Sequence, residues 1–171
     1  MDSLKQVIRD FPDFPHSGIL FRDITTILKD PKHFHDAIER LEGHLSDVDY
    51  DLVISPESRG FMFGAPIAAR QTKGFVPARK KGKLPGEVLT KTYFLEYGMD
   101  AIEIHKDAIL PGQKVVIVDD LLATGGTSKG ICDIVEELGA KVVRIVFLVE
   151  LCGINGREVL KDYDVRTVLQ Y

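Results

Sequence analysis

The sequence predicts a single α/β domain whose central sheet is mostly parallel and is flanked by helices. Apolar runs typical of buried strands alternate with segments of helical periodicity, and this alternation favours a parallel sheet. The 171 residues are 44% hydrophobic and 28% charged, which suits one globular domain with a substantial core. One apolar run ends in two acids and a glycine-rich loop, and ligands of such folds bind at the carboxyl ends of strands.

The amino-terminal segment mixes helical and broken stretches. Apolar side chains recur at helical spacing in residues 4–11, after a possible cap at Asp2 and Ser3. Residues 11–23 hold prolines and a glycine inside an apolar stretch, which predicts an ordered loop or edge segment. Residues 30–45 begin with Asp-Pro and carry apolar side chains on one face, so they predict a second helix.

The rest of the chain alternates strands and helices. Residues 91–105 predict two strands that turn at Tyr97 and Gly98. Residues 80–86 are basic and are broken by glycine and proline, so they predict a mobile loop, with a solvated linker as the alternative. The other expected strands are residues 50–55, 74–79, 114–120, 141–149 and 165–169, and the other expected helices are residues 61–71, 127–138 and 155–161.

Charge and cysteine content restrict the class of protein. A formal net charge of −4 gives no reason to expect a nucleic-acid partner. Cys132 and Cys152 lack the paired spacing of zinc or redox sites, and we expect both to be reduced. The chain starts with polar and charged residues, and no stretch approaches the roughly 18 uncharged apolar residues of a membrane span. We therefore expect a cytoplasmic protein with no membrane partner.

The stretch "VVIVDDLLATGGTSKG", residues 115–130, carries the strongest chemical signal. The expected strand ends at Asp119 and Asp120, and a loop of small and hydroxylated residues leads into a helix. Glycines let backbone N–H groups turn inward, the hydroxyls of Thr124, Thr127 and Ser128 add donors, and the helix start adds partial positive charge. The loop is therefore predicted to bind an anion, although a plain strand-to-helix turn with a capping threonine is the structural alternative.

The two acids beside this loop restrict the ligand. The loop matches neither the Walker phosphate loop nor the glycine pattern of dinucleotide-binding folds. Carboxylates repel phosphate but accept hydrogen bonds from vicinal hydroxyls. A sugar phosphate would satisfy both parts, and Mg²⁺ bridging a sugar and a diphosphate would also suit nearby acids.

Five segments then match a known family in order and spacing: "FPDFPHSGILFRDITTIL", "ESRGFMFG", "RKKGKLPG", "FLEYG" and "VVIVDDLLATGGT". With them the chain resembles the type I phosphoribosyltransferases, and among these the enzymes that use adenine. The resemblance covers most of residues 1–171 and implies one domain with an amino-terminal hood of about residues 1–30 and a flexible loop of about residues 80–97. It also implies a Mg²⁺-dependent homodimer whose substrates are phosphoribosyl pyrophosphate and adenine and whose products are AMP and pyrophosphate.

The resemblance assigns roles to individual positions. Glu96 matches the glutamate beside the purine, and the metal is bound together with the diphosphate, not by the protein alone. The 5-phosphate loop comprises Ala123, Thr124, Gly125, Gly126 and Thr127, with Asp119 and Asp120 beside the ribose. Pyrophosphate is assigned to Arg59, Arg79 and Lys83, and adenine to Leu20 and Arg22.

Glu96 is also favoured by chemistry. The reaction exchanges bonds at an anomeric carbon, and a base must take the proton of the purine. Relatives that use hypoxanthine or orotate carry an acid or hydroxyl-type group where this chain has Ala123, so the carboxylate must come from elsewhere. Phe94 and Tyr97 would shield Glu96 and raise its pKa. The structural alternative for Glu96 is a solvated glutamate at a strand edge. The structural alternative for Arg59 is a surface arginine that caps a helix.

Two other functions of the same fold stay open. Xanthine or hypoxanthine presents a carbonyl at C6 that needs a donor, whereas adenine presents an amino group, and residues 14–24 favour adenine. A regulator that senses the ligand without turnover would be expected to carry an added DNA-binding module or a basic face. Ser55, where many relatives have glycine, is a departure that could strain the turn before Arg59.

Overall fold

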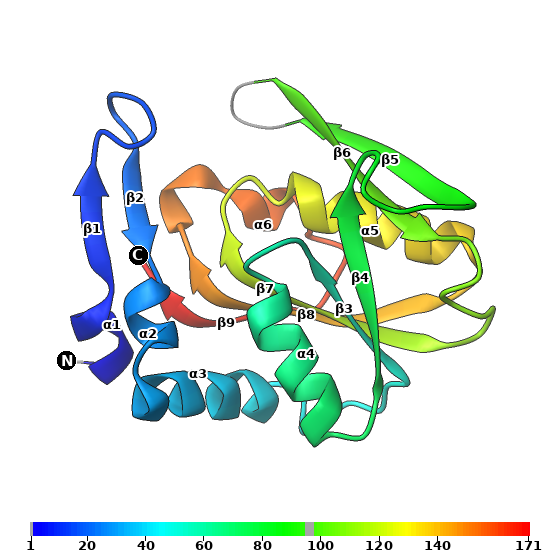
Figure 1. Ribbon diagram of the computed structural model, residues 1–171, viewed down its shortest axis with the longest axis horizontal. Coiled ribbons are helices and arrows are strands. Elements are labelled where there is room, and N and C mark those ends of the chain that lie inside the picture. The colour runs from blue at the N-terminus through cyan, green and yellow to red at the C-terminus, as the bar shows by residue number, and fades with distance from the viewer. Residues whose placement is uncertain (1, 95–97) are drawn as a thin grey trace. The chain divides into compact units, whose positions relative to one another are not determined.

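The computed structural model describes residues 2–94 and 98–171, and the chain divides into two compact units, Met1–Arg40 and Leu41–Tyr171 (Figure 1). Glu96 and Tyr97 therefore lie outside the described residues. The first unit contains α1 (Ser3–Val7), β1 (Arg9–Pro12), β2 (Leu20–Asp23), α2 (Thr25–Leu28) and most of α3 (Pro31–Gly43). Nothing in this division tests the expected hood of residues 1–30, which stays a prediction.

The first unit differs from the sequence expectation in one respect. Asp2 caps α1 as expected, with Oδ1 accepting from the Leu4 N–H at 3.0 Å, but the helix ends at Val7 and Phe11 lies in β1. β1 and β2 form an antiparallel pair in which Phe11 faces Phe21. The backbone becomes extended at Ile8, and the next residues pair with β2 across a turn in which the Gly18 N–H donates to Asp13 Oδ1 at 2.7 Å.

The second unit is built on a seven-stranded sheet with the order β5-β6-β4-β3-β7-β8-β9. The four pairings from β4 through β3, β7 and β8 to β9 are parallel, whereas β6 pairs antiparallel with both β4 and β5. The strands are β3 (Leu52–Pro56), β4 (Gly74–Lys80), β5 (Val88–Phe94), β6 (Met99–His105), β7 (Lys114–Leu122), β8 (Lys141–Glu150) and β9 (Val165–Gln170). The predicted α/β architecture with a mostly parallel sheet is confirmed.

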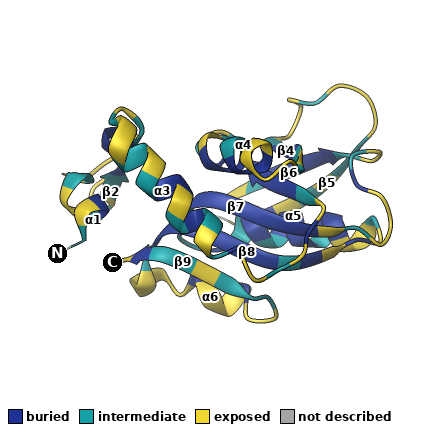
Figure 2. Cartoon of the chain, turned by 90° about the horizontal axis from the view of Figure 1, so that it is seen from below, coloured by how far each residue is buried: buried dark blue, intermediate teal, exposed yellow. Residues whose placement is uncertain are grey.

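Two of the helices that the sequence predicted pack on this sheet. α4 (Phe61–Arg70) packs against β3, β4 and β7, and α5 (Gly126–Glu137) packs against β5, β6 and β8. The short η1 (Cys152–Ile154) and α6 (Gly156–Val159) follow β8. Figure 2 shows β7 and β8 buried along most of their length, as central strands with two covered faces should be. No helix in the described part of the chain has the length and apolar character of a membrane span.

Two expected boundaries moved, and both affect the site. β7 continues to Leu122, so Asp119 and Asp120 lie inside the strand and not at its end. β5 begins at Val88, so much of the segment 80–97 that the sequence assigned to a flexible loop is strand. The turn before β5 is held to β6, because the Gly82 N–H donates to Glu103 Oε2 at 2.9 Å. The mobility of this segment stays a prediction.

The strand order has a switch point beside β3, where the chain changes from one half of the sheet to the other. β3 has β4 on one side and β7 on the other: the chain runs from β3 to β4, β5 and β6 on one side, then crosses from β6 to β7 and continues to β8 and β9 on the other side. Ligands of α/β sheets bind outside the carboxyl ends of the strands at such a switch point. The turn after β3 and the loop after β7 both begin there.

Candidate active site

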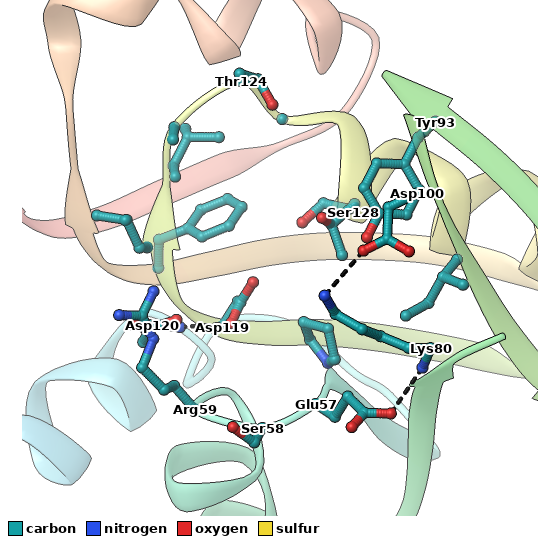
Figure 3. A pocket seen from close by; sticks show the side chains of 18 residues that line it. Glu57, Ser58, Arg59, Lys80, Tyr93, Asp100, Asp119, Asp120, Thr124 and Ser128 are labelled. Atoms are coloured by element: carbon teal, nitrogen blue, oxygen red, sulfur yellow. Dashed lines mark hydrogen bonds and ion pairs between the residues drawn. The ribbon is translucent and has the colours of Figure 1, made fainter. Parts of the chain in front are cut away.

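A cavity of about 450 Å³ lies at this switch point in the second unit (Figure 3). The turn after β3, the end of β4, the hairpin β5–β6 and the loop after β7 form its walls. Its lining residues are Pro56, Glu57, Ser58, Arg59, Lys80, Tyr93, Asp100, Ile102, Asp119, Asp120, Leu121, Leu122, Ala123, Thr124, Gly125, Thr127, Ser128 and Phe147.

One wall is residues 121–127, which we call the phosphate loop. Gly125 adopts a φ of +79°, and α5 starts directly after it. This left-handed backbone favours glycine and turns the start of the helix toward the cavity. The hydroxyl-bearing residues Thr124, Thr127 and Ser128 line the same space. Free N–H groups of a first helical turn, hydroxyl donors and the positive end of a twelve-residue helix together suit an anion.

The back of the phosphate loop is packed against α6 without space. A Cβ atom added at Gly156 would lie 2.1 Å from the Ala123 carbonyl oxygen, and one added at Gly125 would lie 2.7 Å from the Gly156 oxygen. The Leu151 N–H also donates to the Leu122 carbonyl at 2.9 Å. The path of the loop is therefore fixed by backbone contact from behind.

An ion pair anchors α6 in turn. Arg157 donates from Nε and Nη2 to the two carboxylate oxygens of Glu150, at 2.6 and 2.8 Å. Thr167 and Gln170 of β9 donate to the same carboxylate, at 3.0 and 3.1 Å. Glu150 is buried, and the Arg157 guanidinium holds its pKa below the usual range. This bidentate pair joins α6 to the carboxyl end of β8.

The two acids of β7 lie beneath the cavity and are both buried, with 9% exposure for Asp119 and 5% for Asp120. Asp119 Oδ1 accepts from the Asp120 N–H at 2.8 Å. Burial and then the neighbouring Asp120 charge raise the pKa of Asp119 well above its ordinary value. Burial also raises the pKa of Asp120, although Arg59 opposes it. Ligand groups that donate hydrogen bonds or carry positive charge would stabilise the ionised forms of both carboxylates.

Arg59 reaches the acids from the turn after β3. Its Nε lies 2.9 Å from Asp120 Oδ2. Gly60 allows this approach, because an added Cβ there would lie 2.8 Å from Asp119 Oδ1 and 2.7 Å from the Pro56 oxygen. Ser55 beneath this turn lies in regular strand β3. The strain that the sequence suggested for Ser55 does not take the form of a left-handed backbone.

The opposite wall contains three residues that the sequence interpretation missed. Lys80 Nζ lies 2.9 Å from Asp100 Oδ2, and Figure 3 shows this pair inside the cavity with Tyr93 beside it. The Tyr93 side chain lies next to them, and after Lys80 it helps to lower the pKa of Asp100. Lys80 was included in the expected loop without a role. Asp100 and Tyr93 had no local motif, and only the strand pairing brings them here.

Comparisons with known proteins identify the family. A family model described as "Phosphoribosyl transferase domain" matches residues 24–170. The chain belongs to this family. It is 52% identical over 171 residues to an adenine phosphoribosyltransferase of Lachnoclostridium phytofermentans, covering all of this chain and 98% of the relative.

Solved structures of the family have the same fold. The adenine phosphoribosyltransferase of Thermoanaerobacter pseudethanolicus superposes with a TM-score of 0.96 at 54% identity, covering 98% of both chains. The enzyme of Saccharomyces cerevisiae, solved with adenine and D-2,5-dideoxy-2,5-imino-altritol 1,6-bisphosphate, gives a TM-score of 0.92 at 42% identity over 96% of both chains. The type I phosphoribosyltransferase fold predicted from the sequence is confirmed.

In this phosphoribosyltransferase the structure brings most of the expected phosphate and ribose residues together. Asp119, Asp120, Ala123, Thr124, Gly125, Thr127 and Arg59 all line the cavity. Gly126 does not. It packs instead under β5, where an added Cβ would lie 2.7 Å from the Phe94 oxygen.

The other expected residues lie elsewhere. Arg79 Nε is 3.2 Å from Glu57 Oε1, and its Nη1 donates to the exposed Lys83 backbone oxygen at 3.3 Å, so neither residue lines the cavity in this conformation of the phosphoribosyltransferase. Leu20 and Arg22 lie on β2 of the first unit, where Arg22 pairs with Asp10 at 2.8 Å. Contacts of these residues with substrate stay predictions, as does every role of Glu96.

Proposed function

We propose that this protein transfers the 5-phosphoribosyl group of phosphoribosyl pyrophosphate to adenine, giving AMP and pyrophosphate in purine salvage. The observation that carries the proposal is the junction of the phosphate loop with the buried pair Asp119 and Asp120 in one cavity. Family membership and full-length relatives named as adenine phosphoribosyltransferases support it. Nothing observed favours xanthine, hypoxanthine or a purely regulatory role.

The two ends of the substrate would bind to different chemistry. The 5-phosphate would accept hydrogen bonds from the phosphate loop and the first turn of α5. The ribose hydroxyls would donate to Asp119 and Asp120, which lie next to the loop along β7. The diphosphate would then extend toward the side of the cavity that carries Arg59 and Lys80.

The charges of the cavity support a requirement for Mg²⁺. Among the described lining residues there are two cations, Arg59 and Lys80, but four carboxylates, from Glu57, Asp100, Asp119 and Asp120. Such a surface suits a diphosphate poorly unless a cation accompanies it. Mg²⁺ typically binds through one or two carboxylates together with phosphate oxygens, so Asp119 and Asp120 would hold it jointly with the substrate. When bound, it would neutralise charge on the leaving diphosphate.

The chemical step exchanges two bonds at the anomeric carbon. The bond from this carbon to the diphosphate oxygen breaks, and the bond to adenine N9 forms, so adenine loses one proton. We assign that proton to Glu96. Glu96→Gln should reduce turnover by about 100-fold to 10,000-fold, because proton transfer is lost, and should leave diphosphate affinity nearly unchanged. Turnover at the wild-type rate would remove Glu96 from the mechanism.

The adenine contact is assigned to the segment that carries Leu20 and Arg22, as the resemblance implies. The adenine enzyme of Saccharomyces cerevisiae was solved with adenine bound, and at 42% identity it supports the same base here. We also propose a homodimer, which light scattering after gel filtration would test. The cytoplasmic location stays a prediction.

A panel assay tests the proposed function most directly. Purified protein is incubated with phosphoribosyl pyrophosphate and either adenine, hypoxanthine, guanine or xanthine, with and without Mg²⁺, and nucleotide and pyrophosphate are measured. We expect AMP only from adenine and only with Mg²⁺. Equal rates with hypoxanthine would reject the adenine assignment, and binding of the diphosphate sugar without any nucleotide formation would favour a regulator.

A further inference from the structure

Among the described residues, the two cations that line the cavity are already paired with carboxylates of the same cavity. Arg59 pairs with the buried Asp120, and Lys80 pairs with Asp100 at 2.9 Å. The second pair is the more exposed of the two, with exposed side-chain fractions of 56% for Lys80 and 24% for Asp100. A diphosphate that enters the cavity would therefore meet Lys80 paired with Asp100, and it could replace Asp100 as the partner of the lysine.

The backbone and the side chain of Lys80 are held by different contacts. Its N–H donates to Glu57 Oε1 at 2.7 Å, and the residue pairs with Ile102 at the end of β4. The ammonium group is held by one ion pair, with Asp100 of the neighbouring strand β6. Loss of that one contact would leave the Lys80 side chain to rotate about a fixed backbone.

Asp100, in contrast, keeps partners when Lys80 leaves. Its Oδ1 accepts from the Ala101 N–H at 2.8 Å, and after Lys80 the neighbouring Tyr93 helps to lower the pKa of the same carboxyl. Tyr93 is itself packed over α5, because an added Cβ at Gly126 or Gly130 would lie 3.2 or 3.5 Å from its ring. The carboxylate of Asp100 is thus a fixed acceptor to which the lysine can return.

We propose that Asp100 is a positioning residue that holds Lys80 in the cavity and competes with the diphosphate group for it. Arrival of the diphosphate moves the Lys80 ammonium from Asp100 to the phosphate oxygens, and departure of pyrophosphate returns it. No proton or covalent bond changes in this exchange. The inference rests on the proposed function, since it names how that site binds and releases its diphosphate.

The proposed competition and a purely structural role of Asp100 predict opposite changes in pyrophosphate affinity when Asp100 is substituted. Removing the Asp100 charge frees Lys80, so Asp100→Asn should bind pyrophosphate with Mg²⁺ about two- to fivefold more tightly, the range expected for a partly exposed ion pair. Pyrophosphate should become a correspondingly stronger product inhibitor. If Asp100 only stabilised the hairpin, the same substitution would weaken pyrophosphate binding.

The test measures the dissociation constant of pyrophosphate with Mg²⁺ by calorimetry for the full-length protein, Asp100→Asn, Lys80→Gln and the double variant. A general loss of negative charge would tighten binding whether or not Lys80 is present. The proposed exchange predicts that Asp100→Asn tightens binding only when Lys80 is present, so the effect disappears in the double variant. Asp100→Glu should stay near the wild type.

Glu87→Gln serves as the matched control. Glu87 precedes the same hairpin and pairs with Lys106 at 3.5 Å outside the cavity, so its loss should leave pyrophosphate affinity unchanged. Unchanged or weaker pyrophosphate binding by Asp100→Asn, in a protein that makes AMP, overturns this inference alone. So does tighter binding that persists without Lys80. A wild-type protein that neither binds pyrophosphate nor makes AMP overturns the proposed function and this inference with it.

Discussion

The two sides of the cavity are built on different physical principles. On one side, the phosphate loop is fixed by backbone packing, and Gly156 leaves no room for even a methyl group behind Ala123. On the other side, which we call the basic side, Arg59 and Lys80 are held by ion pairs with Asp120 and Asp100. Packing constrains the first side and exchangeable charge constrains the second.

The difference suits the two parts of the proposed substrate. The 5-phosphate stays on the sugar throughout the reaction, so a rigid, preorganised site loses nothing by holding it. The diphosphate must bind and then leave, so contacts that can be exchanged with internal carboxylates favour release. The two sides should therefore respond differently to substitution, to salt and to pH.

Among the substitutions that compare the two sides, the largest effect is expected from Gly156→Ala on the rigid side. The new methyl group would lie 2.1 Å from the Ala123 carbonyl oxygen, so the phosphate loop or α6 must move. A displacement of about 1 Å at a positioning element can reduce rate about 100-fold. We expect kcat/KM for phosphoribosyl pyrophosphate to fall by about that factor in steady-state assays.

Gly153→Ala is the control for this prediction. Gly153 lies in η1, just before α6, and no atom of the described residues lies within 4 Å of a Cβ atom added there. It should keep wild-type kinetics. Circular dichroism would show whether both variants are folded. A Gly156→Ala enzyme with wild-type kcat/KM would mean that packing does not fix the loop.

A smaller effect is expected from Asp120→Asn on the basic side. The amide cannot balance Arg59 and accepts more weakly from ribose hydroxyls, so the KM for phosphoribosyl pyrophosphate should rise about tenfold with less change in kcat. Charge interactions are screened by salt, whereas packing is not. As KCl is increased from about 0.05 M to about 1 M, the ratio of variant to wild-type KM should decrease for Asp120→Asn but stay constant for Gly156→Ala. Equal salt dependence would remove the contrast.

The sequence predicted the rigid side better than the basic side, for a physical reason. The phosphate loop is local: strand, acids, glycines and helix start follow one another within residues 119–127, so one motif contains the whole arrangement. Gly156, which supports it from behind, is about thirty residues away, and its signal was only a glycine at a helix start.

The basic side depends on pairings that no local pattern contains. Lys80 and Asp100 meet because β4 and β6 pair antiparallel, and Lys80 is opposite Ile102 in that register. The sequence predicted the hairpin but began it at residue 91 and assigned residues 80–86 to a loop. Without that pairing, Arg79 and Lys83 were as plausible as Lys80. Register between distant strands is set by tertiary packing, which the composition of one segment does not reveal.

Opposite pH dependences should distinguish the acids of the two sides in the empty protein. Burial and then Asp120 raise the folded-state pKa of Asp119 above its unfolded value near 3.8. The folded protein therefore binds the proton more tightly, and this contribution to stability is lost as pH rises through the raised pKa. Asp119→Asn should gain free energy of unfolding relative to the wild type as pH increases from about 4 to 8 in urea titrations.

Asp100 should give the reverse sign. Lys80 lowers its folded-state pKa, so its contribution to stability is present above the unfolded value of 3.8 and is lost as pH falls through the lowered pKa. Asp100→Asn should therefore lose free energy of unfolding relative to the wild type as pH rises from about 2 to about 5, with little further change up to about pH 8. The same slope for both variants would contradict the distinction between a buried acid and an ion-paired acid.

The smallest effect is expected beneath the basic side, at Ser55. This residue is fully buried on β3 and faces Gly64 of α4, and its hydroxyl has no hydrogen-bond partner among the described residues. A buried hydroxyl without a partner is unfavourable, so Ser55→Ala should be neutral or up to about 1 kcal/mol more stable, with unchanged kinetics. Ser55→Gly should instead lose about 0.5–1 kcal/mol, because glycine weakens a strand interior. Chemical denaturation of the three proteins decides the order. If Ser55→Gly were more stable than the wild type and Ser55→Ala, Ser55 would strain the strand that precedes Arg59. The position of Arg59 would then depend on the strained backbone and not only on its ion pair.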